Sequence, residues 1–269
     1  MRRVIAVMGR GLLLAMLLVA GSVFGLSARE IRIPQEARLW GQVVIAEWFY
    51  QVVHQVPHDV MQARTFEAWP GRDDPVPASD DFDVRIEAHP GDVLVLEPGQ
   101  YTADLFVYTP NITIRTDPKS SGNASIWGTI EVDSTGVTLD HLIVTGPRKC
   151  VGNACSSGHG IEVNRLFVRS ITIRNVRVED RDWVGIHVIG PNGQMSLVQI
   201  ENCELVHNGM DGMDAQSTDR LVITGSTITD NGWDNAQGVG VRIGMNVGQV
   251  EMTGNVIERN RYQNVFRRE

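Results

Sequence analysis

The sequence predicts an all-β solenoid in which short parallel strands stack coil upon coil. Two observations carry this prediction: apolar residues recur at intervals of 23 to 34 residues, and a strand that opens with glycine follows four of them. Three short strands per repeat cannot bury their apolar faces alone, but stacked repeats can. A sandwich of antiparallel strands would instead need hairpin turns between neighbours.

The first 28 residues have the layout of a secretory signal peptide. Arg2, Arg3 and Arg10 precede an apolar run over residues 12–24, and small residues follow. This run is shorter than the about 20 apolar residues that a membrane-spanning helix needs. We therefore expect a secreted or periplasmic protein with no membrane span once residues 1–28 are removed.

The charge of the chain argues against nucleic acid as a partner. The formal net charge is −8, and it becomes −11 without residues 1–28, because this segment holds three Arg and no acidic residue. Binding to phosphates needs clustered Lys and Arg, and beyond residue 28 no run of these residues is longer than a pair such as Arg267-Arg268 near the end of the sequence.

Two segments come between the signal peptide and the repeats. Residues 29–68 are predicted to form an N-terminal helical cap, because apolar residues within 36–54 fall at helical spacing. Residues 69–90 are rich in Pro and Asp and are interpreted as an acidic connector. The β region is then expected over residues 91–269.

A common frame runs through the repeats. Ser170 to Val178 matches Leu197 to Leu205, with two strands of period two joined at Asn175 or Asn202. The apolar residues that align the repeats are Ile114, Leu139, Ile173, Ile200, Ile223 and Met252. In the later repeats Gly225 and Gly254 stand where the two strands are joined. Each repeat then reaches a second recurring residue, an asparagine: Asn208, Asn231 or Asn260.

This layout, with the entry segment Gly91-Asp-Val-Leu-Val-Leu-Glu-Pro-Gly-Gln-Tyr101, resembles the right-handed parallel β-helix, or pectin-lyase-like, superfamily. The resemblance covers residues 91–269 and implies a right-handed solenoid of about seven turns, whose open end an N-terminal helix would plug. It is weaker for activity, because the superfamily holds lyases, hydrolases, epimerases and non-catalytic members.

The glycine-initiated strands predict a row of polar side chains. In each strand the residue between two inward apolar residues must point outward. Equivalent positions on successive coils lie ~4.8 Å apart. The row should contain Glu162, His187, Asp214 and Arg242, with a second row of Asn164, Ile189, Gln216 and Gly244 beside it.

The functional interpretation is a groove for a sugar chain. Trp183 and Trp233 would offer ring faces, Asn164 and Gln216 would offer amides, and Asp211 would lean over the same face. His187 between two carboxylates should have a raised pKa and act as a base. Arg242 would neutralise a sugar carboxylate, as lyase or epimerase chemistry on an acidic glycan requires.

Other interpretations remain open. Glu162 and Asp214 lie two coils apart, or ~9.6 Å, which leaves an inverting hydrolase possible. The charged row could equally stabilise neighbouring strands, and the tryptophans could pack in loops. The alternative function is therefore a non-catalytic β-helix that binds a glycan or a periplasmic or surface partner.

Three further features complete the prediction. His159, in Gly158-His159-Gly160, is similar to a motif of the polygalacturonase branch, but the Asn-Thr-Asp strand and the Asp-Asp pair of that branch are missing upstream. Cys150 and Cys155 bracket a short loop and are predicted to form a disulfide, with no metal-binding Cys or His spacing beside them. No cofactor is required by the sequence, and calcium on Asp211 and Asp214 is the one cation considered.

Overall fold

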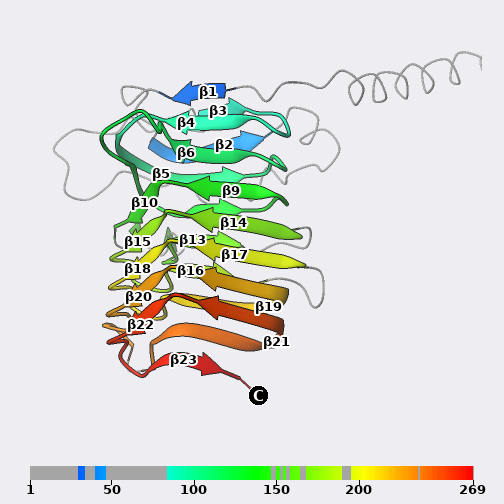
Figure 1. The fold of residues 1–269 in the computed structure, drawn as a ribbon. Helices are drawn as coiled ribbons and strands as arrows, with labels where there is room; N and C mark the ends of the chain where they lie inside the picture. The colour runs from blue at the N-terminus through cyan, green and yellow to red at the C-terminus, as the bar shows by residue number, and fades with distance from the viewer. Residues whose placement is uncertain are drawn as a thin grey trace, which may run out of the picture.

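The structure is a computed structural model, and it shows a parallel β-solenoid (Figure 1). It describes residues 30–33, 40–46, 84–146, 150–151, 154–155, 158–163, 168–189, 195–235 and 237–268. One 21-stranded sheet wraps round the molecule, and a separate two-stranded hairpin stands beside it. The described strands form three ladders, and all the pairings within them are parallel.

The first ladder contains the apolar residues that align the repeats. Its strands are β1 (Glu30–Ile33), β4 (Val93–Leu96), β6 (Thr113–Thr116), β9 (Val137–Asp140), β14 (Ser170–Arg174), β17 (Leu197–Glu201) and the later parts of β19 (Met213–Thr224) and β21 (Val239–Thr253). The register pairs Ile114 with Leu139 and so on to Met252, so the predicted alignment is confirmed. Met252 itself is exposed because it lies on the last coil.

The second ladder is shorter and follows a sharp corner. Its strands are the start of β5 (Gly99–Val107), β7 (Ala124–Trp127), β10 (Leu142–Thr145), β15 (Arg177–Glu179), β18 (Glu204–Val206), β20 (Thr227–Thr229) and β22 (Val256–Glu258). Asn175 and Asn202 at the corner have φ values of 54° and 50°. Asn tolerates this left-handed conformation better than most residues, which explains its place at the predicted joints.

The third ladder carries the polar row. Its strands are β3 (Val84–Glu87), β2 (Trp40–Ala46), the rest of β5, β8 (Ile130–Val132), β13 (Ile161–Val163), β16 (Ile186–Val188), the starts of β19 and β21, and β23 (Gln263–Arg267). A Cβ on Gly185 would lie 2.6 Å from the carbonyl oxygen of Gly212. Glycine therefore opens this strand because the next coil passes too close for a side chain.

The predicted N-terminal helix is wrong where the structure describes it. Residues 40–46 form β2, which pairs with β3 and β5, and Ile45 is fully buried. The run Val43-Val44-Ile45 is β-branched, and such residues favour a strand that packs on a core. The apolar residues within 36–54 are so numerous that they fit the 3.6-residue period of a helix as well as the two-residue period of a strand. The sheet also begins before residue 91, since β3 lies inside the segment interpreted as a connector.

Several other predictions fall partly or wholly outside the described residues. The signal peptide, the rest of the helical cap and most of the acidic connector lie there. Cys150 and Cys155 face each other across the hairpin of β11 (Cys150–Val151) and β12 (Ala154–Cys155), but their side chains are not described, so the disulfide stays a prediction. A search of the described residues for an apolar helix of membrane-spanning length finds none.

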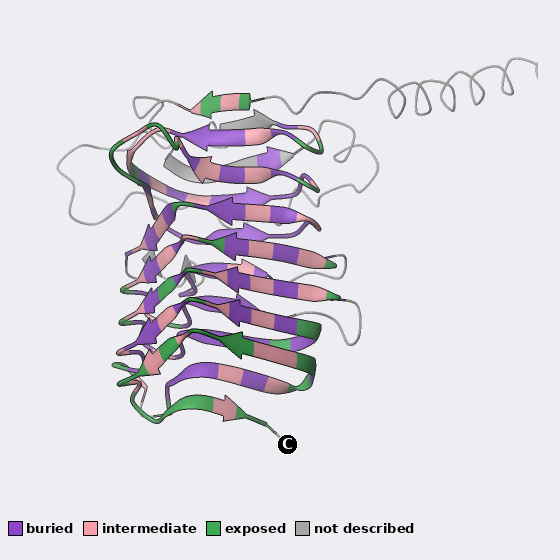
Figure 2. Ribbon diagram, viewed as in Figure 1, coloured by how far each residue is buried: buried purple, intermediate pink, exposed green. Residues whose placement is uncertain are grey.

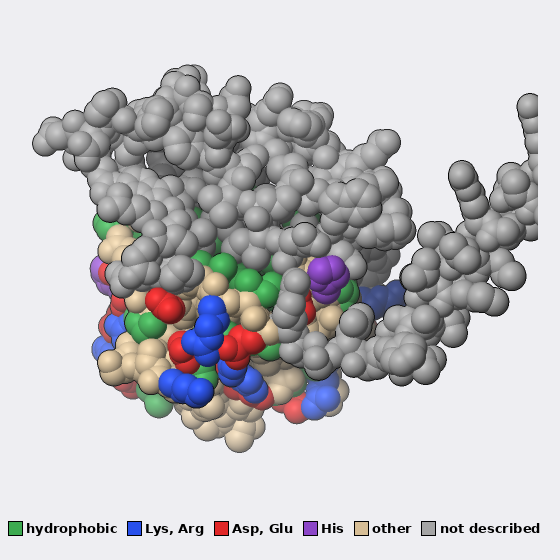
Figure 3. Space-filling model, turned by 90° about the horizontal axis from the view of Figure 1, so that it is seen from above, with side chains coloured by type: hydrophobic (Ala, Val, Ile, Leu, Met, Phe, Trp, Pro, Cys, Tyr) green, Lys and Arg blue, Asp and Glu red, His purple; other side chains and the backbone are tan. Residues whose placement is uncertain are grey.

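Burial follows the alternation of the strands. Figure 2 shows buried and partly exposed residues alternating along most strands, and most of the buried apolar residues form one core cluster. On the described surface visible in Figure 3, Lys and Arg side chains lie among Asp and Glu side chains. Exposed ion pairs of this kind include Arg220–Glu251 and Arg259–Asp230.

Candidate functional site

The predicted polar row is confirmed by the strand register. Glu162 pairs with His187, His187 with Asp214, and Asp214 with Arg242 on four consecutive strands of the third ladder. Their neighbours along each strand, such as Ile186 and Val188, are fully buried. The row therefore points away from the core, as the period of two requires. The register also extends it, because Glu131 precedes Glu162 and Phe266 follows Arg242.

The centre of the row is covered, which corrects the prediction of an open groove. His187 retains 8% of its surface and Asp214 retains 7%. The ring of His159 stacks on that of His187, with centroids 4.2 Å apart, and the ring of Trp183 meets His159 edge-on at 5.1 Å. A turn before the strand therefore covers the row, which strand periodicity alone does not predict.

His187 and Asp214 form a buried pair, with Nε2 and Oδ2 3.8 Å apart. The predicted rise in the pKa of His187 is wrong. Burial lowers this pKa, and the carboxylates of Asp214 and Glu162 offset only part of the effect. Burial likewise raises the pKa of Asp214, against the hydrogen bond that Gln216 donates. Removal from water thus disfavours both charges, and it outweighs their attraction.

Arg242 is engaged by the protein itself. Its Nε donates to Asp211 Oδ2 at 2.6 Å and its Nη2 donates to Asp211 Oδ1 at 3.0 Å. The backbone N–H of Val239 also donates to Asp211 Oδ1. The hydrogen bonds from Arg242 raise the pKa of its guanidinium. The prediction that Arg242 is free to hold a substrate carboxylate therefore does not fit this geometry.

The second row is less regular than predicted. Asn164 lies outside the described residues. Gln216 lies at an irregularity in the register between Ala215 and Ser217, and its amide donates to Asp214 Oδ2 at 3.0 Å. Gln216 is exposed and lies beside the polar row. Its amide is bonded to Asp214, however, and does not line an open groove.

Both predicted tryptophans are partly open to solvent. Trp183 and Trp233 retain 37% and 43% of their surface. They lie in the turns that lead into β16 and β21, two coils apart. The indole N–H of Trp233 donates to the carbonyl oxygen of His207 at 3.0 Å, and the two rings stack at 5.7 Å. Each ring is therefore fixed in its turn but still presents surface.

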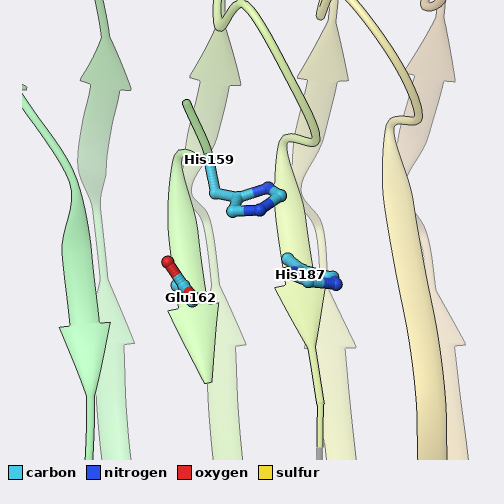
Figure 4. A group of neighbouring side chains, drawn as sticks. All are labelled: His159, Glu162 and His187. Carbon is cyan, nitrogen blue, oxygen red and sulfur yellow. The ribbon is translucent and has the colours of Figure 1, made fainter. Parts of the chain in front are cut away.

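His159, Glu162 and His187 form the densest cluster of potential ligands in the described residues. Their ligand atoms all lie within 4.8 Å of one another. Figure 4 shows His159 reaching from the turn before β13 towards β16, with Glu162 and His187 on the two adjacent strands. His159 lies outside the strand pattern, so strand periodicity does not place it beside the polar row. The available signal was its place next to the glycine that opens β13.

Calcium on Asp211 and Asp214 does not fit these contacts. Both oxygens of Asp211 already accept hydrogen bonds from the guanidinium of Arg242. Calcium needs six to eight oxygen ligands, and a bound guanidinium at one of the two carboxylates opposes a second cation. We therefore assign no calcium to this pair.

Comparisons with known proteins bear on the fold. The sequence model of a family described as "Right handed beta helix region" matches residues 159–266. A solved structure, "Crystal structure of pectate lyase Pel9A", has 14% sequence identity and a TM-score of 0.44, and the match covers 68% of this chain and 60% of that chain. No curated protein matches the sequence. The family match and the three parallel ladders together show that this chain has the right-handed parallel β-helix fold.

Proposed function

We propose that this protein acts on an acidic polysaccharide outside the cytoplasm, by lyase- or epimerase-type chemistry at the polar row. One observation carries the proposal: the His187–Asp214 pair lies buried beside turns that present the partly exposed rings of Trp183 and Trp233. Aromatic rings suit the apolar faces of sugars, and a buried pair of proton-bearing groups suits transfer of a proton. Export rests on the signal-like residues 1–28.

The reaction has two chemical requirements. A proton must leave C5 of the sugar, next to its carboxylate. In a lyase the electron pair forms a C4–C5 double bond, the bond from C4 to the glycosidic oxygen breaks, and that oxygen takes a proton. In an epimerase a proton returns to C5 from the opposite face. Both reactions need a group that accepts the proton and a positive charge that stabilises the carboxylate as C5 loses its proton.

The residues divide between these tasks. The His187–Asp214 pair exchanges the proton, and Glu162 lies next to it on the preceding coil. Trp183 and Trp233 would hold the chain on either side of one intervening coil, ~9.6 Å apart in the backbone. The positive charge is the unmet requirement, because Asp211 holds Arg242.

The proposal is tested with a panel of uronate-containing polysaccharides. The wild-type protein should produce either new double bonds, seen by ultraviolet absorbance, or a changed sugar configuration, seen by nuclear magnetic resonance. His187→Ala and Asp214→Asn should each abolish turnover, whereas Arg220→Ala on the first ladder should not. Turnover that survives both substitutions would show that the polar row does not take part in the reaction. Absence of turnover across the panel would refute the proposed enzymatic activity.

Burial of the row favours a second candidate function. His187 and Asp214 are nearly inaccessible, which suits a non-catalytic protein that binds glycan through its turns. Binding that needs Trp183 and Trp233, without product and without any effect of His187→Ala, would support this alternative.

A further inference from the structure

We infer that His159, Glu162 and His187 bind a divalent transition-metal ion. The three residues come from the turn before β13, from β13 and from β16, so two adjacent coils supply them (Figure 4). Two imidazoles and one carboxylate form a donor set that suits zinc and similar ions, and calcium prefers oxygen alone.

The distances permit such a site after a small contraction. Donor atoms about 2.1 Å from a tetrahedral ion are about 3.4 Å from one another. The three donors here lie within 4.8 Å. Rotation of the Glu162 side chain, which is only half-buried, would bring its carboxylate closer to the two rings. A fourth position would remain for water or substrate.

The surroundings of His187 support the assignment. Its Nε2 faces Asp214 Oδ2 at 3.8 Å, whereas its Nδ1 is buried and makes no hydrogen bond within the described part of the chain. Histidine ligands commonly direct one nitrogen at the metal and the other at a carboxylate, which orients the ring. Asp214 is thus a positioning residue for His187 in the metal-bound state.

His159 is held from behind by the protein. Its carbonyl oxygen accepts hydrogen bonds from Arg181 Nη2 and from Thr129 Oγ1, each at 2.9 Å. Arg181 is fully buried, and it also donates to the carbonyl oxygens of Thr145 and Gly146. The turn that carries His159 therefore has a fixed backbone, which favours a defined ligand position.

A cation here would provide what the proposed reaction lacks. It would place positive charge in the polar row, where Arg242 is already paired with Asp211, and could attract the carboxylate of a uronate. This use of the ion rests on the proposed function, whereas the binding site itself does not.

Zinc binding to the full chain, without any sugar, tests the inference. After dialysis against a chelator, titration calorimetry and elemental analysis should find one ion that depends on this cluster. His159→Ala, Glu162→Gln and His187→Ala should each weaken zinc binding by about 10-fold or more. Loss of a residue that only hydrogen-bonds to a metal ligand already lowers metal affinity by about 10-fold, and loss of a ligand should lower it at least as much. His207→Ala, at the exposed pair with Asp180, is the matched control and should bind as the wild type does.

The outcomes separate this inference from the proposed function. Cobalt in place of zinc should give the visible spectrum of a four-coordinate ion in the wild type and lose it in Glu162→Gln, a nearly isosteric change that should preserve the fold. Binding that is absent in the wild type, or unchanged in all three ligand variants, overturns the site. A silent polysaccharide panel with intact zinc binding would reject only the proposed enzyme.

Discussion

Arg242 and Asp211 form a two-point ion pair across neighbouring coils, with Nε and Oδ2 2.6 Å apart. The side chain of Asp211 is 2% exposed, and that of Arg242 is 29% exposed. The guanidinium also lies over the ring of Phe266, 5.4 Å from its centroid. The arginine of the polar row therefore ties β21 to the turn before β19 and is not available to a ligand.

We expect Asp211→Ala to destabilise the protein by about 3 kcal/mol, because it leaves a partly buried guanidinium and the N–H of Val239 without their acceptor. Glu251→Ala breaks the exposed pair with Arg220 and should cost much less, because solvent screens an ion pair on the surface. Urea unfolding of both variants measures the difference. Equal effects would mean that the Asp211 pair contributes no more than a surface one.

The asparagine markers of the repeats form a buried stack. Asn208 Nδ2 donates to Asn231 Oδ1, and Asn231 Nδ2 donates to Asn260 Oδ1, each at 2.9 Å. Asn231 Oδ1 also accepts from the backbone N–H of Asn208. Asn231→Ala should therefore cost about 3 kcal/mol, because several buried groups lose partners at once. Asn260→Ala, at the half-buried end of the stack, should cost less, and thermal unfolding midpoints would rank the two.

Much of the fold could be predicted because strand periodicity and repeat length are local properties of the sequence. They were sufficient to align Ile114 with Leu139, and to order Glu162, His187, Asp214 and Arg242 in one row. They did not identify β2, because its apolar residues satisfy a helical stripe as well as a strand.

The chemistry of the row was less predictable because it depends on what covers the strands. His159 stacks on His187 from a turn that has no period of its own. Its ring excludes water, and burial then reverses the expected direction of the His187 pKa. The pairing of Arg242 with Asp211 also crosses from a strand to a turn of the previous coil.

Asp140 should contribute stability that depends on pH. Burial alone would raise its pKa, but hydrogen bonds from Asn175, His141 and Arg174 together lower it below the ordinary value of 3.8. A carboxylate with a lowered folded pKa stabilises the protein above its unfolded pKa, and the contribution is lost as pH falls through the folded value. The wild type should thus exceed Asp140→Asn in stability by a constant amount above about pH 5. This difference should shrink below pH 3.8, and urea unfolding across that range would reveal it. A difference that does not change with pH would contradict the charged role of Asp140.

Arg181 should control both stability and the position of His159. Burial lowers the pKa of its guanidinium to about 10, so it remains charged at neutral pH and depends on the carbonyl oxygens around it. Arg181→Lys retains a charge but cannot reach the carbonyls of Thr145, Gly146 and His159 together, because an ammonium lacks the planar fork of donors. We expect a loss of about 2 to 3 kcal/mol in stability for the unpaired carbonyls. Zinc affinity, measured below the unfolding temperature, should also fall, although Arg181 itself donates no ligand atom. Arg177→Lys on the exposed face of β15 is the matched control, and it should change neither quantity. A variant at Arg181 that loses stability but binds zinc as tightly as the wild type would show that this arginine supports the core without positioning His159.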